Sequence, residues 1–240
     1  MCAALLALGV VAVDAHASVV IGGTRVIFNG EERETTVKLT NDGKVPALTQ
    51  VWIDKGDQSA DPSVLKVPFM LTPPISRIDP GKGQTLRVLF DGQPLPADKE
   101  SVFWLNVLEV PPKPGAEMAG VNTLSLAYRT RIKLFYRPSG LKGVAQEAPA
   151  KVTWRVVRDG GKVALEASNP TQYFVSFSSV ELVGGAGSVE ANDGGMVGPG
   201  ETARFALKGD APATAGTVRF RAINDWGGPV DGQTSLNPNG

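Results

Sequence analysis

The chain has 240 residues, with 24 lysines and arginines balanced by 24 aspartates and glutamates and a pI near 6.6. This balance argues against a nucleic-acid-binding protein, which would carry an excess of basic residues. The 28 glycines and 18 prolines separate short apolar runs, and this composition favours an all-β protein of one large or two smaller domains.

The first residues of the chain are typical of a secretory signal peptide. Residues 5–13 read LLALGVVAV and lead to Ala15-His16-Ala17, which predicts cleavage before Ser18. The apolar run is too short to span a membrane, so residues 1–17 are not expected to embed the protein in one. Cleavage there removes Cys2 and His16, which are the single cysteine and the single histidine. The mature chain would then lack the side chains for Cys or His zinc sites, cysteine nucleophiles and Ser-His-Asp triads, and no cofactor or metal is expected.

The next segments predict short strands separated by turns. Residues 19–28, VVIGGTRVIF, predict a strand interrupted at Gly22-Gly23, where the chain either bulges or switches between sheets. Alternating apolar residues continue at 34–40, 47–53, 86–90 and 101–110, and Trp52 is expected to pack in the core. Pro73-Pro74 cannot donate ladder hydrogen bonds, so it predicts an edge or kink at which a cis bond would fit.

Residues 122–138, NTLSLAYRTRIKLFYRP, contain the longest alternating pattern in the chain. The even positions are apolar and many odd positions are basic, which is the period of a β-strand. A strand of this length spans roughly 45–50 Å, more than twice the length of a typical strand. Two interpretations stay open: a long core strand with a solvated basic face, or an edge strand offered to a partner. The even positions are Leu124, Leu126, Tyr128, Ile132, Leu134 and Tyr136, and the odd ones include Arg129, Arg131, Lys133 and Arg137.

Ser139-Gly140 predicts the joint between two domains, residues 18–138 and residues 139–240. The second half repeats the strand pattern with weaker signals, and no helix longer than one or two turns is predicted. Its glycine-rich segments are not followed by Lys-Ser/Thr or by a helix, so they are interpreted as turns and not as phosphate-binding loops. The predicted architecture is two immunoglobulin-like β-sandwiches.

Several separated motifs resemble the periplasmic pilus chaperones of the chaperone/usher pathway, and the resemblance covers nearly the whole chain. It implies two immunoglobulin-like domains set at an angle around a cleft. It also implies a periplasmic chaperone without enzymatic activity or ATP that folds and caps pilus subunits and delivers them to an outer-membrane usher. The motifs are GTRVIF (23–28), TPP (72–74), DKESVFWLN (98–106), LNVLEVPP (105–112), IKLFYRP (132–138), NPT (169–171) and INDWGG (223–228).

The resemblance also implies roles for five charged residues. Arg25 and Lys133 match the two cations that bind the C-terminal carboxylate of a subunit in the cleft. Glu100, Arg137 and Asp225 match an ionic network between the domains. Taken one by one, without the resemblance, a strand lysine is more often simply solvated, and a surface ion pair contributes little.

Leu124, Leu126 and Tyr128 match the side chains that such a chaperone inserts into the incomplete sandwich of a subunit by β-augmentation. An apolar unpaired edge also predicts that two copies cap each other when no subunit is bound. The alternative from a different class is a secreted two-domain immunoglobulin-like structural or adhesive protein. An enzyme using paired carboxylates is the weakest interpretation, because the sequence contains no pocket-like Asp/Glu pair.

Overall fold

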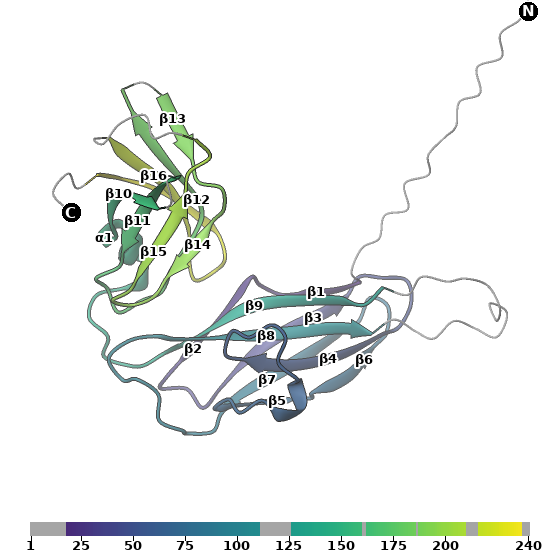
Figure 1. The fold of residues 1–240 in the computed structure, drawn as a ribbon. Helices are drawn as coiled ribbons and strands as arrows, with labels where there is room; N and C mark the ends of the chain where they lie inside the picture. Colours follow the sequence, from purple (N-terminus) through teal and green to yellow (C-terminus); the bar gives the residue numbers. More distant parts are fainter. Residues whose placement is uncertain (1–17, 111–125, 160–161, 186, 210–215, 237–240) are drawn as a thin grey trace, which may run out of the picture.

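The computed structural model describes residues 18–110, 126–159, 162–185, 187–209 and 216–236, and these form two β-sandwiches with separate cores (Figure 1). The N-terminal sandwich carries the first core and the C-terminal sandwich stands over one of its ends (Figure 1). The prediction of an all-β protein with two domains is therefore confirmed.

Two sheets form the N-terminal sandwich. One has the order β1-β3-β7-β5, and the other has the order β2-β9-β8-β4-β6. Apolar residues alternate along these strands, and their buried members face each other between the sheets. The bounds are β1 Val19–Ile21, β2 Arg25–Asn29, β3 Glu34–Asn41, β4 Ala47–Asp54, β5 Phe69–Thr72, β6 Ile75–Ile78, β7 Gly83–Phe90, β8 Ser101–Val110 and β9 Tyr128–Arg137, with a 3-10 turn η1 at Pro62–Val64.

The first predicted strand switches sheets at Gly22-Gly23. β1 pairs antiparallel with β3, whereas β2 pairs parallel with β9 in the opposite sheet. The switch places Arg25 at the start of β2, where the chain enters the second sheet. The Thr72–Pro73 bond between β5 and β6 is cis, as the prolines suggested.

Strand β9 covers ten residues, fewer than the pattern at 122–138 predicted. Leu124 lies outside the described residues, and Leu126 precedes the strand. β8 pairs with β9 from residue 128 to 136, but β2 occupies the other edge only from residue 133 to 137. Among the strands that the structure describes, none pairs with the outer edge at residues 128–132. β9 is therefore an edge strand in its first half and an internal strand in its second, and whether the open edge receives a partner stays a prediction.

The expectation of a simply solvated basic face on β9 is wrong. Arg131 forms an ion pair with buried Asp54, and Phe135 on the same face packs against Phe174 of the C-terminal domain, with 5.7 Å between ring centroids. The prediction that Trp52 packs in the core is also wrong. Trp52 lies outside the core cluster, and the guanidinium carbon of Arg129 lies 4.9 Å from the centre of its ring. Its position in β4 opposite Asn106 of β8 puts it on the outer face of the sheet.

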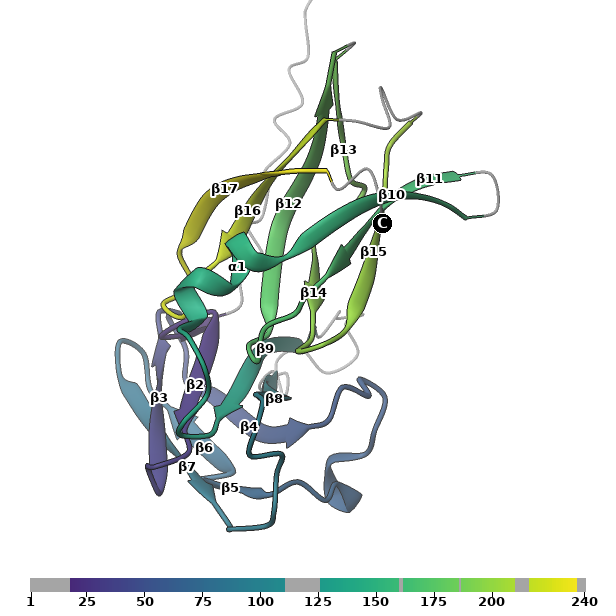
Figure 2. The ribbon, with the colours of Figure 1, turned by 90° about the vertical axis from the view of Figure 1, so that its left-hand side faces the viewer.

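The C-terminal sandwich packs around Trp154, which is 1% exposed and contacts Phe177 and Phe205. One sheet has the order β10-β11-β15, and the other has the order β13-β12-β16-β17 with β14 paired to β12. A 3-10 turn and a single helical turn follow the linker and lie toward the N-terminal domain (Figure 2). The bounds are η3 Ala145–Glu147, α1 Ala148–Lys151, β10 Thr153–Asp159, β11 Lys162–Ser168, β12 Val175–Gly184, β13 Gly187–Glu190, β14 Gly195–Val197, β15 Thr202–Ala206, β16 Thr217–Ile223 and β17 Pro229–Ser235.

Candidate functional site: a cationic cleft between the domains

The parallel pairing of β2 and β9 brings Arg25 and Lys133 together. The two residues are direct partners in the register, so their side chains project from the same face of the sheet. That face is turned toward the C-terminal domain. Arg25 Nη1 donates to the carbonyl oxygen of Ile223 at 2.9 Å, and Lys133 Nζ donates to Ser176 Oγ at 3.0 Å.

Neither cation forms an ion pair with any of the described residues, and the buried Nε of Arg25 has no hydrogen-bond partner there. Burial lowers the pKa of Arg25, although the charges of Asp225 and Glu100 oppose this effect. Burial, together with the adjacent charge of Arg25, lowers the pKa of Lys133 to about 8. Two partly desolvated cations side by side are costly unless an anion joins them, so the pair is suited to binding a carboxylate.

A cavity of about 180 Å³ lies beside Arg25, between the domains. Phe135, Phe174 and Ala222 supply apolar walls, and Arg25 and Ser176 also line it. Trp226, in the turn between β16 and β17, stands at the same cavity and is 78% exposed. Arg25 therefore adjoins a largely apolar recess, and Lys133 is linked to its wall by the hydrogen bond to Ser176.

The predicted network of Glu100, Arg137 and Asp225 is present as a set of contacts between the domains. Arg137 Nε donates to Glu100 Oε1 at 2.6 Å, and its two terminal nitrogens donate to the oxygens of Asp225 at 2.7 and 2.9 Å. The second oxygen of Glu100 accepts the amide of Phe174 at 2.7 Å. The guanidinium also lies over the ring of Tyr173 at 5.4 Å. One arginine thus joins a carboxylate from each domain.

Burial and the neighbouring charges together shift the pKa values of this network. Burial raises the pKa of Glu100, which is 3% exposed, and the attraction of Arg137 and the amide of Phe174 only partly offset that rise. Burial would lower the pKa of Arg137, but the hydrogen bonds and charges of Asp225 and Glu100 outweigh it and raise the pKa instead. The arginine is therefore cationic at every relevant pH and holds the network together.

Two of the three residues predicted for the donor strand, Leu126 and Tyr128, lie where the open edge of β9 begins. Leu126 is 49% exposed, and Tyr128 is half-buried and pairs with Glu109 of β8. Leu124 falls outside the described residues. The even positions of Leu126 and Tyr128 continue the face of Ile132 and Leu134, which are buried in the core. The apolar face of β9 thus extends past the core to exposed residues.

A further cluster on the outer face of the sheet was missed by the sequence reasoning. Asp54, which is fully buried, accepts from Arg131 at 2.5 Å and lies 3.6 Å from Arg129. The ring of Trp104 lies under the guanidinium of Arg131 at 4.0 Å and under the ammonium of Lys133 at 5.7 Å. Burial opposes ionisation of Asp54, but hydrogen bonds from Arg131 and other donors outweigh it and lower the pKa of the carboxyl.

This cluster contacts the candidate site through Trp104, which packs against Lys133. Trp104 contacts Arg131 and Lys133 together, so the ion pair between Arg131 and Asp54 helps to position the lysine. The signal available in the sequence was an aromatic residue in FWLN together with arginines at odd positions of β9. Periodicity could not identify their partner, because Asp54 is 77 residues away from Arg131.

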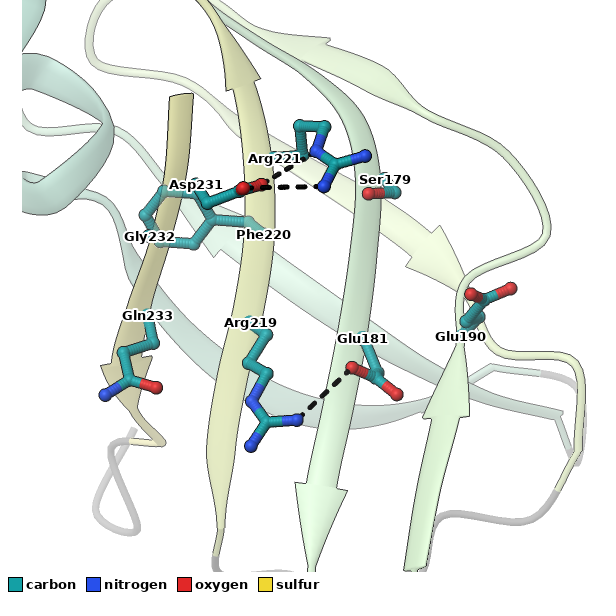
Figure 3. A pocket seen from close by; sticks show the side chains of 9 residues that line it. All are labelled: Ser179, Glu181, Glu190, Arg219, Phe220, Arg221, Asp231, Gly232 and Gln233. Carbon is teal, nitrogen blue, oxygen red and sulfur yellow. Dashed lines mark hydrogen bonds and ion pairs between the residues drawn. The ribbon is translucent and has the colours of Figure 1, made fainter. Parts of the chain in front are cut away.

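A larger hollow of about 530 Å³ lies on the outer face of the C-terminal domain (Figure 3). Its charged side chains already have partners: Arg221 pairs with Asp231 at 2.7 Å and Arg219 with Glu181 at 4.0 Å (Figure 3). Glu190 pairs with Lys208. The hollow is therefore a polar surface with satisfied charges, unlike the cleft.

Within the residues covered by the structure, no group of three or more His, Cys, Asp or Glu side chains is arranged to hold a metal ion. The same residues include no helix that is long and apolar enough to cross a membrane.

The fold and the cleft define a class: two-domain, all-β binding proteins with a cationic cleft between the sandwiches and a half-open edge strand leading to it. Residues 18–142 match the family "Pili and flagellar-assembly chaperone, PapD N-terminal domain". Residues 147–234 match "Pili assembly chaperone PapD, C-terminal domain". The chain belongs to this family of pilus-assembly chaperones.

Known relatives and solved structures agree with this assignment. The probable fimbrial chaperone YadV of Escherichia coli K12 is 47% identical over 92% of this chain and 90% of its own, and the chaperone protein FimB/FhaD of Bordetella pertussis is 48% identical over 92% and 89%. The crystal structure of YadV superposes with a TM-score of 0.79 at 42% identity, covering 92% of this chain and 100% of that one. The SafB chaperone in complex with the SafA pilin of Salmonella enterica gives 0.76 at 27% identity, over 91% and 96%.

Proposed function

We propose that this protein captures pilus subunits by adding the first half of β9 to a subunit as a donor strand, and that Arg25 and Lys133 bind the carboxylate at the subunit's C-terminus. The observation that carries the proposal is the position where β2 joins β9. A strand added to the open edge at residues 128–132 cannot continue past residue 133, because β2 occupies the edge from there. An incoming chain that runs parallel to β9, as β2 does, therefore ends beside two cations that have no carboxylate partner among the described residues.

The two parts of this surface contribute differently to binding. Leu124, Leu126 and Tyr128 enter the apolar groove of the subunit, and each buried side chain contributes about 1.5–3 kcal/mol before the costs of association. The carboxylate anchor contributes alignment, since charge-assisted hydrogen bonds at one point set the register of the added strand. Losing one cation from such a cluster costs about 2–5 kcal/mol.

The ionic network sets the geometry in which the anchor works. Arg137 joins Glu100 of the N-terminal domain to Asp225 of the C-terminal domain. We assign it the role of holding residues 18–138 and 139–240 at one angle, so that the C-terminal domain keeps Ser176 and Ile223 against the cations.

The relatives support the cellular context of the proposal. They are named as fimbrial chaperones, and SafB was solved with a pilin. By this relationship the protein acts in the periplasm after loss of residues 1–17, passes subunits to an outer-membrane usher, and catalyses no reaction. A merely structural or adhesive module has no need of two adjacent cations beside an open strand edge.

Co-purification with a pilus subunit from the periplasm tests the proposal. Arg25→Ala and Lys133→Ala are expected to leave the chaperone folded, with an unchanged thermal midpoint, but to recover little subunit. Lys66→Ala is the matched control, because Lys66 is an exposed lysine in a loop of the same domain. Normal recovery of the complex from both cleft variants would exclude the carboxylate anchor.

A further inference from the structure

The first described residue of the chain is held by a carboxylate of the opposite sheet. Ser18 N donates to Glu109 Oε2 at 2.9 Å, and Ser18 Oγ donates to Glu109 Oε1 at 2.5 Å. Val19 N donates to Oε2 at 3.1 Å. β1 belongs to the sheet of β3, whereas β8, which carries Glu109, belongs to the sheet of β9. One carboxylate therefore ties the edge strand β1 across the sandwich.

Glu109 differs from the buried carboxylates in the charge of its partners. Asp54, Glu100 and Glu166 each meet at least one arginine. Glu109 meets none in the described part of the chain, and its three donors there are two amides and a hydroxyl. A half-buried carboxylate with several donors and no cation is an incomplete ion pair.

The predicted cleavage before Ser18 supplies the missing cation at the required atom. Hydrolysis of the Ala17–Ser18 bond adds one water, leaving a carboxylate on Ala17 and an amine on Ser18 that takes up a proton. An α-amino group has a pKa of about 7.7–8.0, so near neutral pH it is largely an ammonium with three donors in place of one. This ammonium forms on the nitrogen that already lies 2.9 Å from Glu109.

We propose that Glu109 is the binding site for the α-ammonium group that cleavage before Ser18 creates, so that the N-terminal domain is completed only in the processed chain. The proposal rests on that predicted cleavage position and is independent of how subunits bind.

The surroundings of Ser18 leave the new terminus little freedom to move away. Asp42 N donates to the carbonyl oxygen of Ser18 at 2.8 Å. On another side, Gly43 approaches so closely that a Cβ at that position would lie 2.5 Å from the Cβ of Ser18. The residue is held by main-chain contacts on one side and by Glu109 on the other.

The contacts of Glu109 with Ser18 and Val19, which we call the clamp, lie next to the open edge of β9. Glu109 pairs with Tyr128, the first residue of β9, so the clamp lies at the end of the sandwich where the open edge begins. Before cleavage, the described groups that hold β1 to Glu109 are neutral donors alone. After cleavage, the ion pair joins β1 to the strand that supports the start of β9, and the precursor keeps a looser N-terminal edge than the mature protein.

Hydrogen exchange of the β1 amides tests this inference in four purified proteins. Two chains begin at Ser18 and two begin at Ala17, which keeps the same net charge but moves the ammonium one residue, about 3.8 Å, along the chain. Each is made with Glu109 and with Glu109→Gln. Glu109→Gln weakens the hydrogen bonds from neutral donors in both pairs, whereas it removes an ion pair only in the chain that begins at Ser18. A hydrogen bond between two charged groups contributes about 1 kcal/mol more than one from a neutral donor, so the loss of protection is expected to be about five- to tenfold larger in the chain that begins at Ser18 than in the chain that begins at Ala17.

Three results would overturn the inference. Equal losses of protection in both pairs would mean that the ammonium group adds nothing to the hydrogen bonds that Glu109 accepts from neutral donors. Loss of the difference in Ser18→Ala, which keeps the ammonium and removes the hydroxyl, would make the hydroxyl the essential donor. A mature N-terminus other than Ser18 in protein from the periplasm would remove the cation from the site.

Discussion

Replacing Arg137 with alanine should destabilise the protein, because the arginine is the shared cation of two carboxylates. Glu100 is 3% exposed and would retain one described hydrogen bond, from the amide of Phe174. Removing one partner of a buried pair costs about 3–5 kcal/mol. The carboxylate of Asp225 is 21% exposed and keeps part of its hydration, so the lower end, about 3 kcal/mol, is expected. For a chain of this size that free energy lowers the thermal midpoint by roughly 6–12 °C.

The dependence of this loss on pH identifies its cause. Burial already raises the pKa of Glu100, and removal of Arg137 raises it further because the opposing attraction is lost. A carboxyl whose pKa is raised in the folded state binds its proton more readily there than in the unfolded chain. The free energy of unfolding of the variant therefore rises as the pH falls from neutrality through that raised pKa toward the ordinary value of 4.5. The deficit relative to the native sequence should narrow over this interval.

Thermal melts at pH 7 and near pH 5 measure both effects. Arg77→Ala is the matched control, since its pair with Asp79 is exposed on both sides and should not change the midpoint. Adding Glu100→Gln to Arg137→Ala should recover part of the loss and flatten its pH dependence. A midpoint for Arg137→Ala equal to that of the native sequence at pH 7 would refute the reasoning and reduce the network to a surface contact.

Three further predictions concern single groups. The affinity for a subunit should fall between pH 7 and 9 as the ammonium of Lys133, with its pKa of about 8, loses its proton. In calorimetric titrations Lys133→Gln should bind weakly and without this pH dependence, and a pH-independent affinity of the native sequence would contradict the anchor. Leu126→Asp should abolish subunit pull-down and reduce self-capping without altering the melt, because the side chain is 49% exposed in the free protein; a collapsed melt would place Leu126 in the chaperone's own core. Asp54→Asn should lower the free energy of unfolding by about 3 kcal/mol, because the guanidinium of Arg131 loses its buried charged partner. An unchanged midpoint of urea unfolding would show that this ion pair contributes nothing to stability.

Much of this protein could be predicted from the sequence by itself, because alternation and turn residues are local properties. They indicated strands, two all-β domains and an interruption at Gly22-Gly23, which the structure shows to be a switch of sheets and not a bulge. The separated motifs, through their resemblance to pilus chaperones, predicted that Glu100, Arg137 and Asp225 would meet, and the structure brings them together.

What only the tertiary structure decided is which neighbours occupy the edges and outer faces of those strands. A period of two tells which residues share a face, but it does not tell which distant strand lies alongside. The parallel pairing of β2 closes the second half of β9 and leaves the first half open, and this places Arg25 beside Lys133. For the same reason the sequence misplaced Trp52 and did not reveal the partners of Asp54 and Glu109. Each of these contacts joins segments more than 50 residues apart, which meet only when the strands assemble.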